Sequence, residues 1–121
     1  MNGLPAVSND TQVPSVQIAD RGVHVERLVP RLVRFVVRAG QVHQTLFNSP
    51  LVITSGNDGN HATGSAHFRN EAVDLRSHDI TSVQAAVFLL VLMLLGQDDG
   101  IAVFDERVNP DKQHWHCEVQ G

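Results

Sequence analysis

A run of eleven apolar residues, AAVFLLVLMLL at positions 85–95, most limits how this chain can fold. As a helix it rises about 16 Å, roughly half of what is needed to cross a bilayer core. Its flanks are polar, with Ser82 and Gln84 on one side and the segment GQDDG on the other. The sequence therefore predicts a helix buried against a sheet, and it predicts no membrane span.

Length and charge exclude several classes of protein. The chain has 121 residues, which suits one domain, and a formal net charge of −4. A chain with a net negative charge lacks the basic surface that binding to nucleic acid requires, so we expect no nucleic-acid partner. The single cysteine excludes an internal disulfide and a CxxC metal site. The N-terminus has neither a basic start nor an apolar core, so we expect synthesis in the cytoplasm without a signal peptide.

The order of local patterns predicts an α+β fold. Residues 1–20 lack a sustained apolar period and are expected to form a flexible arm, with the folded domain over 21–121. Pro30 suits the first turn of a helix that ends at Asn48, and the apolar run forms a second helix that ends at Gly96. Strands are predicted at 51–55, 71–76, 101–106 and 114–119. We therefore expect a small, mostly antiparallel sheet backed by two helices.

The last predicted strand, HWHCEV, separates two kinds of side chain. Side chains alternate along a strand, so His114 and His116 share one face, roughly 6–7 Å apart. The same alternation turns Trp115 and Cys117 into the core. Glu118 shares the histidine face. It could orient an imidazole as a hydrogen-bond acceptor, but we expect a solvated edge residue there.

Histidine and aspartate near the middle of the chain supply further metal ligands. His67 and Asp74 are seven residues apart, which excludes the helical HExxH arrangement. Together with the later histidines they could hold zinc through three protein ligands and leave a fourth position open for water. Two histidines and one carboxylate could equally hold iron in an oxygenase, and the residue types alone leave this alternative open.

The context of these residues resembles one peptidase family. The segment ITSGNDGNHATGSAHFRNEAVDLR (53–76) contains Ser65-x-His67-x6-Asp74, and it is followed by the HxH strand HWHCEV (114–119). This order is similar to that of the zinc D-Ala-D-Ala carboxypeptidases and L-alanyl-D-glutamate endopeptidases, a group that includes the hedgehog signalling domain. The resemblance covers residues 22–121 and implies a hedgehog/DD-peptidase-like zinc fold.

The resemblance also implies roles for individual residues. It implies three zinc ligands: His67, Asp74 and His116. It places His114 beside the metal as a polar partner. The family needs an acidic residue shortly before the HxH strand as general base and acid. We take Asp111 as the first choice and Glu106 as the alternative.

Two loop residues also match the family. His61 corresponds to a histidine that lines the active site in hedgehog-like members, although a solvent-exposed position is almost equally expected. Asn70 stands where the family usually has glycine, and asparagine tolerates a left-handed backbone.

The function that this resemblance implies is zinc-dependent hydrolysis of an amide bond in peptidoglycan stem peptides, with zinc-bound water as the nucleophile. The motifs leave open whether the bond is a carboxypeptidase or an endopeptidase target, and they leave the oligomeric state open. Small size is reminiscent of phage lytic enzymes, which would act on the cell wall after release. The alternative is a non-catalytic binding or structural module that is stabilised by zinc.

Overall fold

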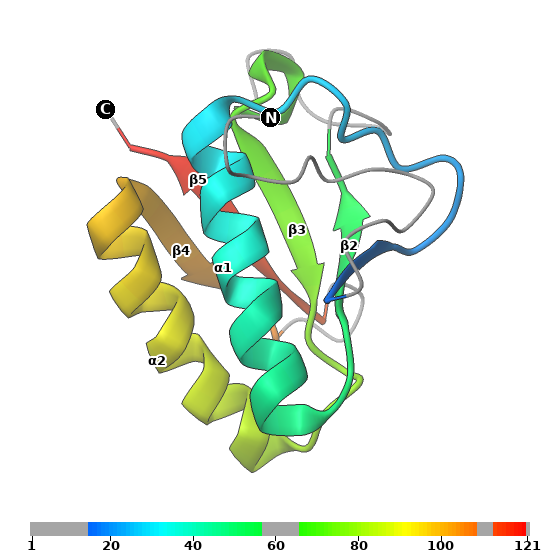
Figure 1. Cartoon of the computed structure of the whole chain (residues 1–121), viewed down its shortest axis with the longest axis vertical. Coiled ribbons are helices and arrows are strands. Elements are labelled where there is room, and N and C mark those ends of the chain that lie inside the picture. The colour runs from blue at the N-terminus through cyan, green and yellow to red at the C-terminus, as the bar shows by residue number, and fades with distance from the viewer. Residues whose placement is uncertain (1–14, 57–65, 109–112, 121) are drawn as a thin grey trace.

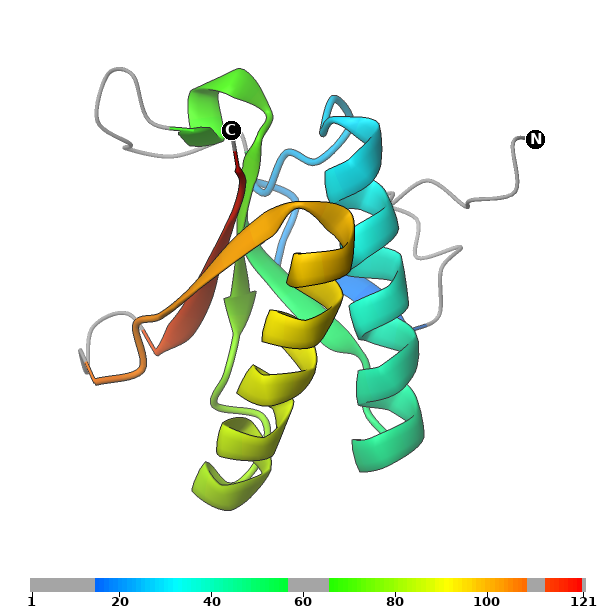
Figure 2. The same cartoon turned by 90° about the vertical axis from the view of Figure 1, so that its left-hand side faces the viewer.

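Two helices cover one face of a five-stranded mixed sheet in the computed structural model, which describes residues 15–56, 66–108 and 113–120 (Figure 1). The strands are β1 (Val16–Ile18), β2 (Leu51–Ser55), β3 (Ala72–Arg76), β4 (Ile101–Asp105) and β5 (His114–Val119). They lie in the order β1-β2-β3-β5-β4. Figure 2 shows α1 (Pro30–Phe47) and α2 (Ser82–Asp99) on the same side of the sheet. The expected α+β class is confirmed, and the sheet is mixed because β1 runs parallel to β2.

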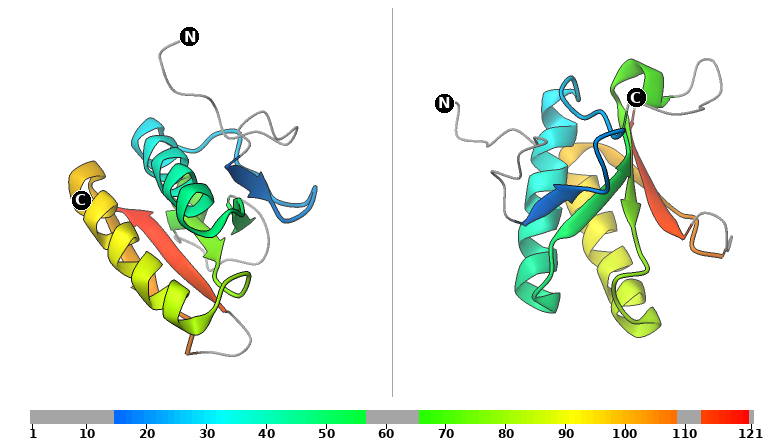
Figure 3. Two further views of the ribbon diagram at one scale, coloured as in Figure 1. Left: turned by 60° about the horizontal axis from the view of Figure 1, so that its bottom comes forward. Right: turned by 90° about the vertical axis from the view of Figure 1, so that its right-hand side faces the viewer.

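Strand β1 corrects the expected boundary of the N-terminal arm. Strand β1 forms an outer edge of the sheet, beside β2 (Figure 3). Its Val16 is 2% exposed and lies opposite Leu51 of β2. The strand also lies close to α1, because a Cβ atom on Gly40 would come within 2.3 Å of the Val16 side chain. Residues 15–20, which were expected to belong to the arm, are therefore part of the folded unit. Residues 1–14 lie outside the described residues.

Helix α1 begins and ends where the sequence predicts. Pro30 occupies the first turn, where its missing N–H is not needed. The helix ends at Asn48, whose backbone is left-handed with φ 53° and whose N–H donates to the Gln44 carbonyl. Its inner face contributes seven buried residues: Leu32, Phe35, Val36, Val37, Ala39, Gly40 and His43.

Helix α2 begins at a predicted cap but ends later than expected. The Thr81 hydroxyl accepts a hydrogen bond from the Gln84 N–H at 3.1 Å, and the Gln84 side chain accepts one from the Thr81 N–H at 2.9 Å. The expected end at Gly96 is wrong, because the helix continues to Asp99 and the next residue is a glycine with φ 72°. Asp99 is 8% exposed and pairs with Arg38 of α1 at 3.1 Å, so its charge is compensated inside the last turn.

Only one side of α2 is covered. Ala85, Phe88 and Leu92 are buried against the sheet and α1, as expected, whereas large apolar side chains are exposed on the opposite side. The 18-residue helix has a mean hydropathy of 1.4 and is 28% buried. By length and composition alone it could span a membrane, a test that core helices of other proteins also pass. The predicted burial is therefore confirmed for one side of the helix.

The core lies between the sheet and the helices. Trp115 of β5 is fully buried, and its ring lies 5.4 Å from that of Phe88. His43 of α1 is also buried, and its Nδ1–H donates to the Ser49 carbonyl at 2.7 Å. Burial lowers the pKa of His43, since desolvation disfavours the charged imidazolium. His43 therefore acts as a neutral core residue.

Replacing Gly96 by alanine is expected to destabilise the protein although alanine is the better helix former. A Cβ atom at this position would lie 2.4 Å from the Ile101 carbonyl oxygen, a backbone atom of β4. We expect Gly96→Ala to lower the free energy of unfolding by about 1–3 kcal/mol, as measured by urea denaturation. Gln97→Ala, at the next and exposed position, serves as the control. An unchanged or higher stability of Gly96→Ala would contradict the close approach of α2 and β4.

Candidate metal centre

The candidate site lies on the face of the sheet that the two helices leave uncovered (Figure 2). Antiparallel pairing sets Asp74 of β3 directly opposite His116 of β5, and Phe104 of β4 flanks His116 on the other side. Burial alternates along β5, with Trp115 and Cys117 fully buried between partly exposed neighbours. The predicted division of this strand into a histidine face and a core face is confirmed.

The start of β5 is held by backbone and side-chain hydrogen bonds from the end of β3. Gln113 has a left-handed backbone with φ 49°, and its carbonyl accepts hydrogen bonds from the Ser77 N–H at 3.1 Å and hydroxyl at 2.7 Å. These bonds fix the register in which the two histidines meet Asp74. Asn70, which precedes β3, also has a left-handed backbone with φ 60°, as asparagine in place of glycine allows.

One line of contacts runs from Asp74 through His116 to Glu118. The Nδ1 atom of His116 lies 2.9 Å from Oδ1 of Asp74, and its Nε2 atom lies 2.7 Å from Oε1 of Glu118. Both ring nitrogens donate in this arrangement, so the imidazole is a cation. The hydrogen bond to Asp74 is the largest cause that raises the pKa of His116, to about 8, and the Glu118 carboxylate adds to the effect.

A second pair lies beside the first. Glu106 follows β4 directly, and its N–H donates to the His114 carbonyl at 3.1 Å, which extends the β4–β5 ladder by one residue. Its Oε1 atom lies 2.6 Å from Nε2 of His114, and the same nitrogen lies 3.6 Å from Oδ1 of Asp74. One potential ligand atom from each of these three residues lies within 4.8 Å of the others. Asp74 therefore faces both imidazoles of β5.

Asp74 is the buried member of the group. It is 7% exposed and is flanked in β3 by the fully buried Val73 and Leu75, which point to the helix layer. A carboxylate removed from water at this depth requires positive partners, since an unpaired buried charge costs several kcal/mol. The imidazolium of His116 supplies such a partner, and a bound cation would also compensate the charge.

The structure places some of the predicted site residues and not others. Asp74, His114 and His116 lie together, as does Glu106, the alternative general base. The backbone of His67 lies in the 3-10 helix Ala66–Arg69, next to the start of β3, and its side chain is outside the described part of the chain. Two other predicted residues, His61 and Asp111, lie outside the described residues. Their roles stay predictions.

Glu118 makes the contact that the sequence analysis weighed but did not favour. It was expected to be a solvated edge residue, yet its carboxylate hydrogen bonds to His116. The signal was present, because strand alternation puts residues 114, 116 and 118 on one face. What could not be read from the sequence is that the Glu118 carboxylate, although 36% exposed, lies within hydrogen-bond distance of Nε2 of His116.

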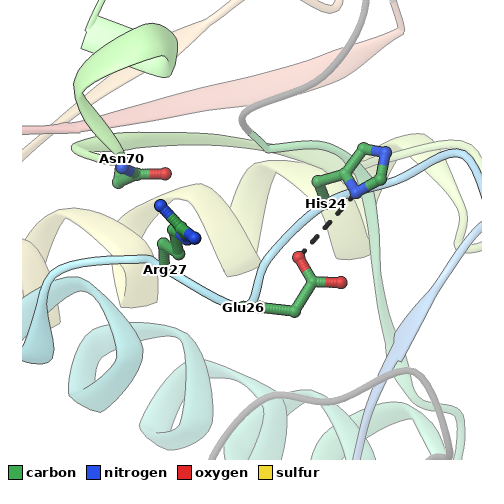
Figure 4. A pocket seen from close by; sticks show the side chains of 4 residues that line it. All are labelled: His24, Glu26, Arg27 and Asn70. Carbon is green, nitrogen blue, oxygen red and sulfur yellow. Dashed lines mark ion pairs between the residues drawn. The ribbon is translucent and has the colours of Figure 1, made fainter.

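A separate polar pocket of about 320 Å³ is lined by His24, Glu26, Arg27 and Asn70 (Figure 4). The Nδ1 atom of His24 lies 3.8 Å from Oε2 of Glu26, and both side chains are more than half exposed. An ion pair in that setting contributes little to stability. This pocket has no buried carboxylate among its lining residues, in contrast to the group around Asp74.

The comparisons with known proteins do not assign a family. The sequence matches no protein-family model and no curated protein. The candidate site must therefore be judged from its own residues and geometry.

The raised pKa of His116 gives a prediction for the protein without metal. We expect His116 to titrate near pH 8 in a histidine NMR experiment, and Asp74→Asn to lower that pKa toward 6.5. The hydrogen-bonded cation contributes about 2 kcal/mol to folding, fully present below pH 6.5 and lost as the pH rises through 8. Asp20→Asn, in an exposed turn, is the control. An Asp74→Asn variant with an unchanged His116 titration would contradict the contact.

Proposed function

We propose that this protein is a zinc-dependent peptidase that hydrolyses an amide bond in peptidoglycan stem peptides. The observation that carries the proposal is the placement of a buried aspartate between two histidines of an HxH strand, on an open face of the sheet. The ordered motifs around residues 53–76 and 114–119 supply the substrate class through their resemblance to cell-wall peptidases.

The donor set suits a divalent cation. Three carboxylates, from Asp74, Glu106 and Glu118, lie against only two imidazoles, those of His114 and His116. The group is therefore negative when both imidazoles are neutral, and it offers the nitrogen and oxygen atoms that zinc prefers. Bound zinc would lower the pKa of its water toward about 7 and so supply a nucleophile near neutral pH.

Two arrangements of ligands are considered. In the first, which the family resemblance implies, the ligands are Asp74, His116 through Nδ1, and His67. In the second, the ligands are Asp74, Glu106 and His114, whose atoms lie within 4.8 Å of one another. We favour the first, because a metal-bound histidine usually donates its other ring N–H to a carboxylate, as Nε2 of His116 does to Glu118.

In the favoured arrangement Glu106 moves the proton. A general base needs a carboxylate within hydrogen-bond reach of the attacking water, and Glu106 lies beside His114 and Asp74 at the end of β4. Its side chain is 32% exposed, so it can meet both the site and an incoming substrate. His114 holds this carboxylate through Nε2 at 2.6 Å. The geometry thus supports the alternative base, and Asp111, the first choice from sequence, stays a prediction.

Substituting the proposed base separates the two arrangements. We expect Glu106→Gln to keep its zinc and to lose hydrolysis by roughly 10²–10⁴-fold, since only proton transfer is removed. His116→Ala should lose both zinc and activity. Zinc content by atomic absorption and peptide hydrolysis are the two measurements.

Glu26→Gln, in the separate polar pocket, is the control and should keep both its zinc content and its activity. Loss of zinc from Glu106→Gln would favour Glu106 as a ligand. Full activity in Glu106→Gln combined with loss in Asp111→Asn would return the role of base to Asp111.

Glu118 is expected to raise the affinity for zinc through its hydrogen bond to His116. Removal of a carboxylate that orients a metal-bound histidine typically lowers affinity by about 10–100-fold. We expect that loss for Glu118→Ala in a competition assay between the protein and a zinc chelator. Glu71→Ala, whose carboxylate pairs with Arg69 at 2.7 Å, is the matched control. Equal zinc affinity of Glu118→Ala and the unchanged protein would contradict this role.

The proposed function is tested most directly on purified peptidoglycan. Mass spectrometry of the digest should detect free D-alanine for a carboxypeptidase, or separated stem peptides for an endopeptidase, and His67→Ala should release neither. A folded, zinc-loaded protein that releases no product would overturn the peptidase proposal. It would favour the alternative, a zinc-stabilised binding or structural module.

A further inference from the structure

Among the described residues, one side of α2 carries a row of exposed apolar side chains that the candidate site does not use. Val83, Ala86, Leu90 and Met93 are all exposed, and they follow each other at intervals of three and four residues. That spacing produces a continuous seam along one side of a helix, of the kind that packs against another helix. Helix α2 lies beside β4, the last strand in the sheet order (Figure 1). Leu90 and Met93 of the seam line a pocket together with residues of β4.

The seam continues into a groove beside an edge strand. The groove has a volume of about 700 Å³ and runs between α2 and β4, with Leu90, Met93 and Leu94 on the helix side and Val103 and Phe104 on the strand side. Within the described residues, β4 pairs only with β5.

The outer edge of β4 is open to pairing. The N–H of Glu106 points to β5, and backbone groups alternate along a strand, so the N–H of Val103 points away from β5. The sequence of β4, IAVFD, contains no lysine or proline of the kind that protects edge strands. An apolar helix seam and an unprotected strand edge thus lie on the same margin of the molecule.

We propose that this margin, formed by α2 and β4, joins two copies of the chain into a symmetric dimer. In a twofold arrangement the same surface meets itself, so a charged surface would repel its copy. Residues 82–97 and 101–104 contain no charged side chain, so no like charges oppose each other when this surface meets its copy. A twofold axis perpendicular to the sheet would pair β4 with β4 in antiparallel fashion and pack α2 against α2 on one side.

The exposed area agrees with a dimer of standard size. Five side chains of the seam and groove are 50–75% exposed: Val83, Leu90, Met93, Leu94 and Phe104. A fully exposed apolar side chain of this size presents about 150–200 Å², so these five leave roughly 500 Å² of apolar surface in solvent. A standard interface buries about 800 Å² per partner, of which a little over half is apolar.

A membrane surface is the less favoured occupant. Helices that lie on membranes carry lysine and arginine on their polar face, and α2 carries neither. The net charge of the chain, −4, also opposes attraction to anionic lipids. The chemistry therefore favours a second copy of the chain.

The test measures mass against protein concentration by sedimentation velocity. We expect the unchanged chain to reach twice its mass of 13.3 kDa as the concentration rises, and Leu90→Glu and Leu94→Glu each to weaken dimerisation by roughly 30-fold or more. Leu46→Glu makes the same change at a half-exposed leucine of α1, away from this margin, and should dimerise normally. Far-UV circular dichroism checks that each variant is folded.

A second measurement does not depend on variants. Hydrogen exchange at the Val103 amide should slow with rising concentration, because that N–H becomes bonded across the strand pair. A chain that stays monomeric throughout, or a dimer that Leu90→Glu and Leu94→Glu leave intact, would overturn the proposal. Binding of the monomer to anionic vesicles without self-association would overturn it in favour of a membrane surface.

Discussion

The pairing of β3 with β5 is the interaction on which both the core and the candidate site depend. One register sets Asp74 opposite His116, and it also sets Val73 opposite Cys117 and Leu75 opposite Trp115. Side chains alternate between the faces of a strand, so a shift by one residue would move the histidines into the core and Trp115 into solvent. The large free energy of burying Trp115 therefore also holds the polar group in place.

The sequence predicted most elements because local signals agreed with the final packing. The proline at the start of α1, the capping residues before α2 and the β-branched run of β2 each have a local physical cause. Strand β1 escaped prediction because its three residues are held by the neighbouring β2 and by the close approach of α1 at Gly40, which are contacts distant in sequence. The end of α2 was misplaced because Asp99, in its last turn, is stabilised by an ion pair with Arg38 of α1. That contact joins residues distant in sequence.

The candidate site shows the same division between local and distant information. Alternation along β5 was sufficient to place His114 and His116 on one face and Trp115 in the core. The choice between Glu106 and Asp111 depended on how the link from β4 to β5 is folded, and spacing along the chain does not contain that information. Glu106 lies next to His114 because the ladder of β4 and β5 extends one residue past the end of β4.

The helices and the polar group lie on opposite faces of a single sheet. A side chain that changes in α1 or α2 can reach the carboxylates and imidazoles only by displacing strands, which are held by hydrogen bonds along their whole length. The outer surface of the helix layer is therefore free to change without altering the geometry of the polar group. In such a molecule, stability and association can be changed by engineering on one side while the chemistry on the other side is preserved.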